Sequence, residues 1–284
     1  MASMRDIKRR RGSVQSTQQI TKAMKLVSTV KLQRAKGRAE RSKTYFKCMY
    51  DTVVSMLSKA GEINHPYLKA GESAKKAVIV ITANRGLAGG YNSNIVKLVK
   101  NNEDWKKEDL IIYPIGSKGR DAFARAGYEL GTDYSDAIEE PIYADAMKIS
   151  QQVLDDFSQG RVGEIYIAYT GFKNTVTHIP TLLKLLPIKL EDERTAEDKA
   201  VLDFEPETEE AVELIIPKYI TSLIYGAMIE SVASENGARM QAMDSATSNA
   251  EEMIDKLSLL YNRARQSSIT QELTEIIAGA EAIS

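Results

Sequence analysis

Proline is missing from both ends of this chain, and that absence constrains the fold more than any other feature. All seven prolines lie between Pro66 and Pro217, so residues 1–65 and 218–284 contain none. Proline inside a helix costs about 3 kcal/mol, because it lacks the amide hydrogen and clashes with the preceding turn. The two ends are therefore open to long, uninterrupted helices.

Apolar residues at both ends recur in alternating steps of three and four, which is the 3.5-residue repeat of helices that pack along a seam. The N-terminal series is Leu32, Ala35, Ala39, Ser42, Phe46, Met49, Val53, Met56 and Ala60. The C-terminal series is Met243, Ala246, Ala250, Met253, Leu257, Leu260 and Ala264. Nearer the start, the same spacing continues in Ile20, Met24 and Val27.

An ordinary bundle of long helices is one interpretation of these seams. Two seams at opposite ends of the chain, separated by a different domain, favour an antiparallel coiled coil of the terminal helices. A C-terminal helix from about Pro217 to about Ala282 would span roughly 100 Å at 1.5 Å per residue. The pattern therefore predicts a rod.

The middle of the chain predicts an α/β domain. Buried-strand runs occur at 76–82, 110–115 and 164–170, and helical stretches are expected at 92–100, 118–126 and 144–157. Alternating strands and helices indicate a Rossmann-like domain with a mostly parallel sheet. Residues 175–190 are expected to be extended, and 191–213 to be an acidic loop. The predicted domains are therefore 1–62 (N-terminal helix), 75–205 (α/β domain) and 208–284 (C-terminal helix).

Charge is distributed unevenly along the chain. The formal net charge is −1, yet residues 1–50 carry fourteen Lys and Arg against two acids. Residues 201–284 carry five Lys and Arg against fifteen acids. Such asymmetry predicts an acidic partner for the basic end, or pairing between the two ends.

Cysteine and histidine are too scarce for several kinds of site. Cys48 is the one cysteine, so no disulfide can form within the chain, and His65 and His178 cannot make a multi-histidine metal site. No cofactor is expected. The short apolar runs predict no membrane-spanning helix, and the charged start predicts no signal peptide.

A glycine-rich loop at 84–92 follows the first predicted strand. Such a loop before a helix can bind phosphate, but the spacing is neither G-x-G-x-x-G nor G-x-x-x-x-G-K-[ST]. A tight strand-to-helix turn is therefore favoured over a nucleotide-binding enzyme. No G-x-S-x-G elbow occurs. The sequence predicts no catalytic residues.

The basic run from Lys8 to Arg11 leaves a second function open. It could bind the phosphates of a nucleic acid, although no reading motif or interleaved aromatic accompanies it before Tyr45. The other interpretation is a basic helix that touches acidic protein surfaces.

Three ordered motifs carry a family resemblance over the whole chain. They are Ile20–Val27 (ITKAMKLV), Asn84–Asn92 (NRGLAGGYN) and the C-terminal runs Ala238–Thr247 (ARMQAMDSAT), Tyr261–Gln266 (YNRARQ) and Ser268–Ile276 (SITQELTEI). In these motifs the chain resembles the gamma subunits of bacterial F-type ATP synthases, the central rotor stalk. The C-terminal runs are the most specific of the three.

The resemblance implies a rotor shaft without bond chemistry of its own. The coiled coil would turn inside a ring of three alpha and three beta subunits, where the catalytic residues lie. The α/β domain would sit at the foot, against the epsilon subunit and the membrane-embedded ring of c subunits. Rotation would couple ion flow through the c ring to ATP synthesis or hydrolysis.

The resemblance also implies contact residues. Met24 and Lys25 match the region that faces an acidic lever segment of beta. Arg239, Gln266, Thr270 and Glu272 match other positions that contact beta. Glu205 matches the foot near the c ring and epsilon, in an acidic loop where the correspondence is looser.

Two departures from the family pattern refine this expectation. Ala88 stands where many members carry cysteine, and the two-cysteine insertion of the chloroplast type is absent. With no transit segment before Met1, the chain resembles the bacterial members. We expect it on the cytoplasmic face of the inner membrane, held there by its partners and binding no nucleic acid.

Overall fold

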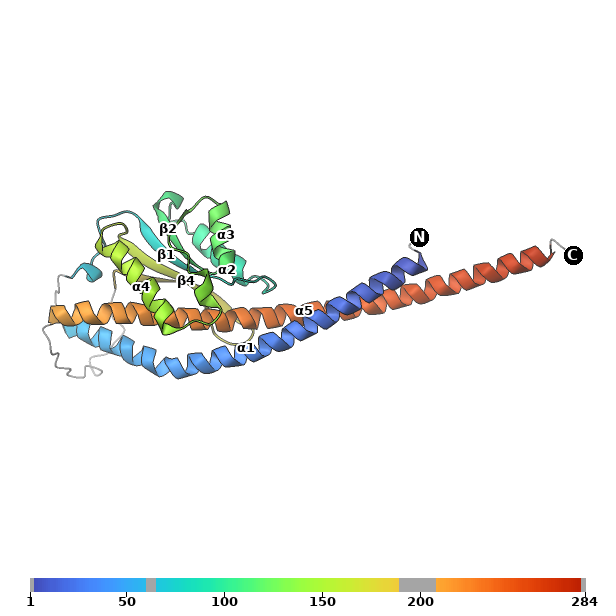
Figure 1. Cartoon of the computed structure of the whole chain (residues 1–284), viewed down its shortest axis with the longest axis horizontal. Helices are drawn as coiled ribbons and strands as arrows, with labels where there is room; N and C mark the ends of the chain where they lie inside the picture. Colours follow the sequence, from blue (N-terminus) through green and yellow to red (C-terminus); the bar gives the residue numbers. More distant parts are fainter. Residues whose placement is uncertain (1–2, 60–64, 189–207, 282–284) are drawn as a thin grey trace. The chain divides into compact units, whose positions relative to one another are not determined.

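Two very long helices begin and end the described chain. The computed structural model describes residues 3–59, 65–188 and 208–281. Helix α1 (Met4–Lys59) has 56 residues and α5 (Thr208–Glu281) has 74, against a typical length of about 11–12 (Figure 1). Both long helices predicted from the proline-free ends are confirmed.

Of the two starts expected for the C-terminal helix, residue 208 agrees with the structure and the vicinity of Pro217 does not. Helix α5 begins at Thr208 rather than near Pro217, and Pro217 lies inside it. The proline removes one backbone hydrogen bond from the helix. Val212, Ile216 and Ile220 are fully buried on the same stretch, and their burial offsets that loss.

The middle of the chain forms a five-stranded sheet in the order β3-β2-β1-β4-β5. The strands are β1 (Lys76–Ile81), β2 (Leu110–Ile115), β3 (Glu129–Leu130), β4 (Glu164–Phe172) and β5 (His178–Leu186). All neighbours pair in parallel except β4 and β5, which are antiparallel. The mostly parallel sheet is confirmed, and β5 accounts for the extended chain expected at 175–190.

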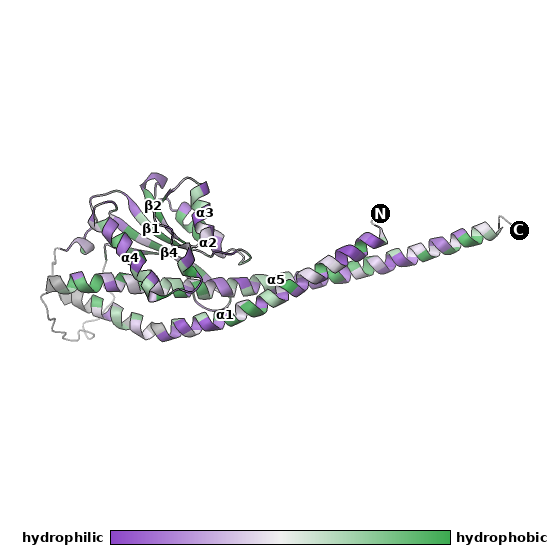
Figure 2. Ribbon diagram, in the orientation of Figure 1, coloured by the Kyte–Doolittle hydropathy of each residue, from purple (hydrophilic) through white to green (hydrophobic). Residues whose placement is uncertain are grey.

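Helices cover the two faces of the sheet with separate apolar cores (Figure 1). Helices α2 (Tyr91–Lys100) and α3 (Ser117–Arg125) place Ile95, Val99 and Phe123 against Val78 and Val80 on one face. Helix α4 (Tyr143–Ser158) and part of α5 cover the other face, with these fully buried residues: Ile79, Ile81, Ile149, Val153, Ile220 and Ile224. Figure 2 shows the central strands as apolar between these layers.

The described chain divides into two compact units. The terminal unit contains α1 up to Ser28 and α5 from Met240 onward, and the sheet unit runs from Thr29 to Arg239. The sheet unit therefore includes stretches of both long helices in addition to the α/β domain.

Within the sheet unit, α1 and α5 run antiparallel. Phe46 stacks edge-on against Tyr225, and Tyr50 lies against Tyr219 further along α1. The predicted seam is confirmed here, since Leu32, Ala35 and Val53 are buried. Ala39, Phe46 and Met49 are half-buried, while the side chain of Ser42, that of Met56 and residue Ala60 lie outside the described part.

Within the terminal unit, α1 and α5 again run antiparallel. The Arg11 guanidinium lies 5.5 Å from the centre of the Tyr261 ring. The hydroxyls of Thr21 and Thr247 are 2.8 Å apart, and Lys25 Nζ lies 2.5 Å from Asp244 Oδ1. As the chain advances along α1, its contacts on α5 therefore move backward in sequence, from Tyr261 to Asp244.

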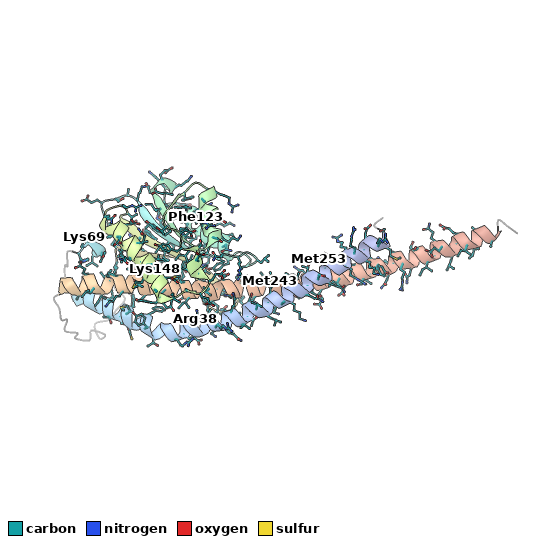
Figure 3. All side chains as sticks on the ribbon, viewed as in Figure 1. Arg38, Lys69, Phe123, Lys148, Met243 and Met253 are labelled. Atoms are coloured by element: carbon teal, nitrogen blue, oxygen red, sulfur yellow. The ribbon has the colours of Figure 1, made fainter. Side chains whose placement is uncertain are left out.

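The predicted C-terminal seam is half right. Met243, Ala250 and Leu257 are buried, but Met253 is 47% and Leu260 is 50% exposed (Figure 3 labels Met243 and Met253). The alternate positions on the packed face are Thr247, Ile254 and Tyr261, each half-buried.

The predicted extension of the N-terminal seam shows the same error. Ile20 and Val27 are exposed, and the neighbouring Thr21 and Ser28 are buried. Hydroxyl residues can occupy a packed face because they donate to their own helix backbone. Thr21 Oγ1 donates to the Gln18 carbonyl, and Thr247 Oγ1 donates to the Met243 carbonyl. A count of apolar residues overlooks such positions.

One stretch of α5 bears on the expectation that no helix spans a membrane. By length and composition alone, α5 between Ala211 and Ala280 contains a stretch that could cross a membrane, and half of that stretch is buried within the protein. Ile216, Ile224 and Met228 belong to the core beneath the sheet. Core packing therefore accounts for apolar composition in this helix.

Candidate functional site

The glycine loop lies at the carboxyl end of the sheet, where parallel α/β domains usually bind ligands. Side chains brace its base. Asn84 Oδ1 accepts from the Ser117 amide at 2.8 Å, and Asn84 Nδ2 donates to the Ser135 carbonyl at 2.9 Å. Asn92 Oδ1 accepts from the Ala83 amide at 2.8 Å. These bonds tie the loop to the neighbouring strand-to-helix turn.

Two glycines permit this close packing. Gly116 has a φ of 112°, and a Cβ there would come within 2.1 Å of the Thr82 carbonyl oxygen. Gly119 donates its amide to Thr82 Oγ1 at 2.8 Å and leaves no room for a side chain. The turn after β2 therefore serves the close approach of two loops.

Helix α5 packs polar groups against the same end of the sheet. Ser231 Oγ accepts from the Thr170 amide at 3.3 Å, and Ser234 Oγ donates to the Thr170 carbonyl at 3.0 Å. Glu230 Oε2 accepts from the Phe172 amide at 3.4 Å. The carboxyl end of β4 is thereby bonded to α5, in the region where a nucleotide would bind a Rossmann domain.

Arg239 joins α5 to the glycine loop. Its guanidinium donates to the Gly86 carbonyl at 3.3 and 3.4 Å and pairs with Glu235 at 2.7 Å. Tyr91 is buried in the same region and packs with Ala83, Ala88 and Ala238. This Arg239–Gly86 contact, with Glu235, is called the loop clasp below.

Titratable groups near the loop clasp are shifted mainly by burial. Burial raises the pKa of Tyr91, and the nearby Glu235 carboxylate raises it further. Burial also raises the pKa of Glu230, against the effect of the Phe172 amide. The raised pKa keeps the Tyr91 phenol protonated at neutral pH.

A second buried cluster is closed within the sheet unit. Asp156 accepts from the Tyr113 hydroxyl and pairs with Arg161 at 2.7 Å. Burial, followed by the hydrogen bond to Asp156, raises the pKa of Tyr113. The carboxylate is satisfied by its own neighbours, so the cluster fits a structural role.

The two histidines lie apart from each other. His65 accepts from the Tyr67 amide through Nδ1 at 3.2 Å, and so caps a short 3-10 helix at Pro66–Leu68. His178 packs against Gly237, where a Cβ would come within 2.5 Å of His178 Nε2. Among the described residues, no group of three or more potential ligands could hold a metal ion.

The predicted contact residues are not gathered in one place. Met24 and Lys25 are half-buried in the terminal unit, where Lys25 pairs with Asp244 of the same chain. Arg239 belongs to the sheet unit and is only 8% exposed, in the loop clasp. Its guanidinium is directed inward.

The remaining predicted contacts lie near the end of α5 or outside the described residues. Gln266, Thr270 and Glu272 are exposed, and Thr270 Oγ1 donates to the Gln266 carbonyl at 2.9 Å. Glu205 falls in the segment 189–207, outside the described part of the chain.

Sequence reasoning missed an exposed apolar strip at the end of α5. The strip consists of Ile269, Leu273, Ile276 and Ile277, all of them exposed. Their spacing places them along one side of a helix, and this spacing was the signal that could have found them. Exposed apolar strips mark interaction surfaces in soluble proteins.

Comparison with known sequences gives a consistent result. A family profile described as ATP synthase matches residues 3–283. The chain is 65% identical to the ATP synthase gamma chain of Lachnoclostridium phytofermentans, with all of both chains covered. It is 42% identical to the sodium ion specific ATP synthase gamma chain of Acetobacterium woodii, with 99% of each chain covered.

Comparison with solved structures supports the fold. A chain of the Euglena gracilis mitochondrial ATP synthase, in a structure described as OSCP, F1 and c-ring, matches with a TM-score of 0.70 and 19% identity. The match covers 99% of this chain and 94% of the other. A chain of the Tetrahymena thermophila central stalk and c-ring matches with a TM-score of 0.59 and 24% identity, covering 80% and 99%.

Proposed function

Since the chain belongs to the ATP synthase gamma family and is a central-stalk subunit rather than a catalytic one, we propose that it works as a rotor shaft. In this proposal, ion flow turns a c-subunit ring, and the shaft turns with it inside three alpha and three beta subunits. Rotation carries the catalytic sites of beta through states of different nucleotide affinity. The same shaft would run in reverse during ATP hydrolysis.

The observation that carries the proposal is the antiparallel helix pair of the terminal unit together with the exposed apolar strip. The α1 helix begins at Met4, and Arg11 already meets Tyr261 of α5. Every described side chain from Ile269 to Ala280 is exposed. An apolar collar formed by the alpha and beta subunits would cover this strip. Such a contact would contain no ion pairs that have to break as the shaft turns.

Charge on α1 supports contact with an acidic surface of beta. Lys8 and Arg10 are exposed, and Arg9 pairs with the neighbouring Asp6 at 3.0 Å. Exposed ion pairs are worth about 0–1 kcal/mol each and are screened by salt. Contacts of that strength suit a shaft that must leave one subunit and meet the next.

The contact residues keep their proposed roles with one refinement. Met24 and Lys25 would face the acidic lever of beta, and Gln266, Thr270 and Glu272 would meet beta near the end of α5. Glu205 would lie at the foot near epsilon and the c ring. Arg239 is treated separately below, because its side chain is buried.

The sheet unit would form the foot, where the complex meets the membrane. The chain would reach the cytoplasmic face of the bacterial inner membrane through epsilon and the c ring. No cofactor of its own is needed for this task, because the proposed role is mechanical.

Reconstitution with alpha and beta tests the proposal directly. Cys48 is exposed, so a Cys48→Ser, Lys148→Cys chain offers a single labelling site on α4 of the sheet unit. We expect ATP-driven, stepwise rotation of a bead attached there. A chain that fails to join a competent alpha–beta ring would contradict the proposal. Salt-dependent nucleic-acid binding through Lys8–Arg11 would then be measured next.

A further inference from the structure

The guanidinium of Arg239 binds two groups of its own chain. The residue is 8% exposed, Nη2 lies 2.7 Å from Glu235 Oε1, and Nε and Nη2 both donate to the Gly86 carbonyl. Glu235 is itself largely buried. A partner that replaced Glu235 in this pair would leave the buried carboxylate of Glu235 uncompensated.

The loop held by Arg239 has a buried base and an exposed tip. Ala88 and Tyr91 are buried beside Ala238 of α5. Leu87, between Gly86 and Ala88, is 64% exposed and has a φ of 61°. A leucine at positive φ is uncommon and persists only where the surroundings impose the conformation. Hydrogen bonds on both sides of Leu87 are the constraint.

Two anchors supply that constraint. On one side, Arg239 holds the Gly86 carbonyl, and Asn92 Nδ2 reaches the Arg85 carbonyl at 3.4 Å. On the other side, the Tyr91 amide donates to the Ala88 carbonyl at 3.2 Å. The hydrogen bonds of Arg239 link the loop to α5, which is one of the two helices of the proposed shaft.

We propose that Arg239 is a positioning residue, which fixes the Arg85–Gly90 loop on α5 and acts on the partner subunits only through that loop. The expected effect on coupling rests on the proposed rotor function, whereas the contact between Arg239 and the loop does not. Loss of the guanidinium frees the loop, and the coupling between rotation and catalysis falls because the loop no longer keeps its place on the shaft.

Tryptic cleavage after Arg85 tests the geometry in the purified full-length chain. Arg85 is exposed within the loop, so its cleavage rate reports how often the loop opens. We expect Arg239→Met to speed cleavage there about tenfold, and Arg239→Lys to restore part of the protection. Arg125→Met is the matched control, because exposed Arg125 also donates to a backbone carbonyl, that of Asp121 at 3.0 Å. An unchanged rate in Arg239→Met would overturn the proposal.

General destabilisation is separated from loop release by a second variant. Arg239→Met leaves Glu235 buried without its partner, so Arg239→Met, Glu235→Gln removes both charges. Fast cleavage after Arg85 with an unchanged midpoint of thermal unfolding supports a local role. Slow cleavage in this double variant would mean that the unpaired charge of Glu235 opened the loop in Arg239→Met, and that the loss of the Arg239–Gly86 contact did not.

A variant cycle in the assembled complex tests the route of action. ATP-driven ion pumping in membrane vesicles is measured for Arg239→Met, Leu87→Gly and the combination. If Arg239 acts through the loop, the combination loses no more pumping than the stronger single variant. Multiplying losses would instead indicate direct contact of Arg239 with a partner. Failure of the wild-type chain to assemble would count against the rotor function alone, because the cleavage result does not depend on partners.

Discussion

In the sheet unit, α5 meets its neighbours through fully buried aliphatic side chains, whereas in the terminal unit its packed face mixes apolar and polar groups. Ile216, Ile220 and Ile224 belong to the core of the sheet unit. The terminal unit combines buried Met243, Ala250 and Leu257 with the Thr21–Thr247 hydroxyl contact and the Lys25–Asp244 pair. One helix is thus held by a continuous apolar core in one unit and by a thinner, mixed contact in the other.

This difference teaches how a single helix can serve two tasks. Burying an aliphatic side chain contributes roughly 1.5–3 kcal/mol, while a typical hydrogen bond contributes about 1 kcal/mol net. The sheet unit should therefore dominate the stability of the isolated chain. The terminal unit leaves the apolar strip of Ile269, Leu273, Ile276 and Ile277 exposed.

The largest expected effect is in the sheet-unit core. We expect Ile220→Ala to lower the free energy of unfolding by about 3 kcal/mol, because Ile220 is fully buried and its truncation leaves a cavity. Ile254→Ala, at a half-buried position of the terminal unit, should cost about 1 kcal/mol. Urea unfolding of both variants measures the two losses of stability. Equal losses would contradict the difference between the sheet unit and the terminal unit.

An ion-pair cluster at the edge of the sheet unit should come next. Burial raises the pKa of Glu164, but hydrogen bonds from Lys184, Lys76 and Tyr166 outweigh it and lower the pKa to about 2. Lys76 Nζ lies 2.9 Å from Glu164 Oε2. We expect Glu164→Gln to cost about 2 kcal/mol at pH 7.

The pH dependence of that loss follows from the direction of the shift. The folded-state pKa lies below the ordinary value of 4.5, so the stabilisation is complete above about pH 5 and disappears as the pH falls toward 2. Urea unfolding between pH 3 and pH 7 measures the difference between wild type and variant. Glu129→Gln is the control, because the exposed Lys75–Glu129 pair should contribute less than about 1 kcal/mol. A difference independent of pH would contradict the assignment.

A smaller effect should separate the two halves of the C-terminal seam. We expect Leu257→Asp to cost about 1.5 kcal/mol and to reduce assembly, since Leu257 is only 9% exposed in the helix pair. Met253→Asp, on the exposed side, should cost less than about 0.5 kcal/mol. Thermal unfolding and the yield of assembled complex check both, and equal effects would restore the seam expected from sequence.

The smallest effect on stability should accompany a clear effect on function. Met24→Lys adds charge beside the basic face of α1, and we expect an over-strong contact with an acidic beta surface. Coupling between ATP hydrolysis and ion pumping should fall, while stability changes by less than about 0.5 kcal/mol. Met147→Lys, the same change at an exposed site on α4, should leave coupling unchanged. Normal coupling in vesicles that contain the Met24→Lys variant would contradict this prediction.

Much of the fold could be predicted because its signals are local. The helices and strands of the α/β domain follow from apolar runs and glycine turns, and the long helices follow from the absence of proline. The presence of Pro217 inside α5 could not be predicted, because it is offset by burial of its neighbours, a tertiary effect. The position of β5 at the sheet edge could not be predicted either, because it is set by the pairing between strands.

The candidate site was less predictable, because burial decides what a side chain can do. The resemblance implies a contact of Arg239 with beta, whereas the inward direction of its side chain depends on Gly86, which lies far away in sequence. Thr21 and Thr247 were missed because a periodicity of apolar residues cannot register hydroxyls. The contacts expected of Gln266, Thr270 and Glu272 with beta stay predictions.

The hydroxyl contact between the two long helices has a further consequence. Thr21 and Thr247 each have a backbone carbonyl of their own helix within hydrogen-bond reach as well as each other. Each hydroxyl carries a single proton, so when one donates across the pair the other can donate to its own helix. If the two helices part, both hydroxyls can still donate to carbonyls of their own helices, and neither is left without an acceptor.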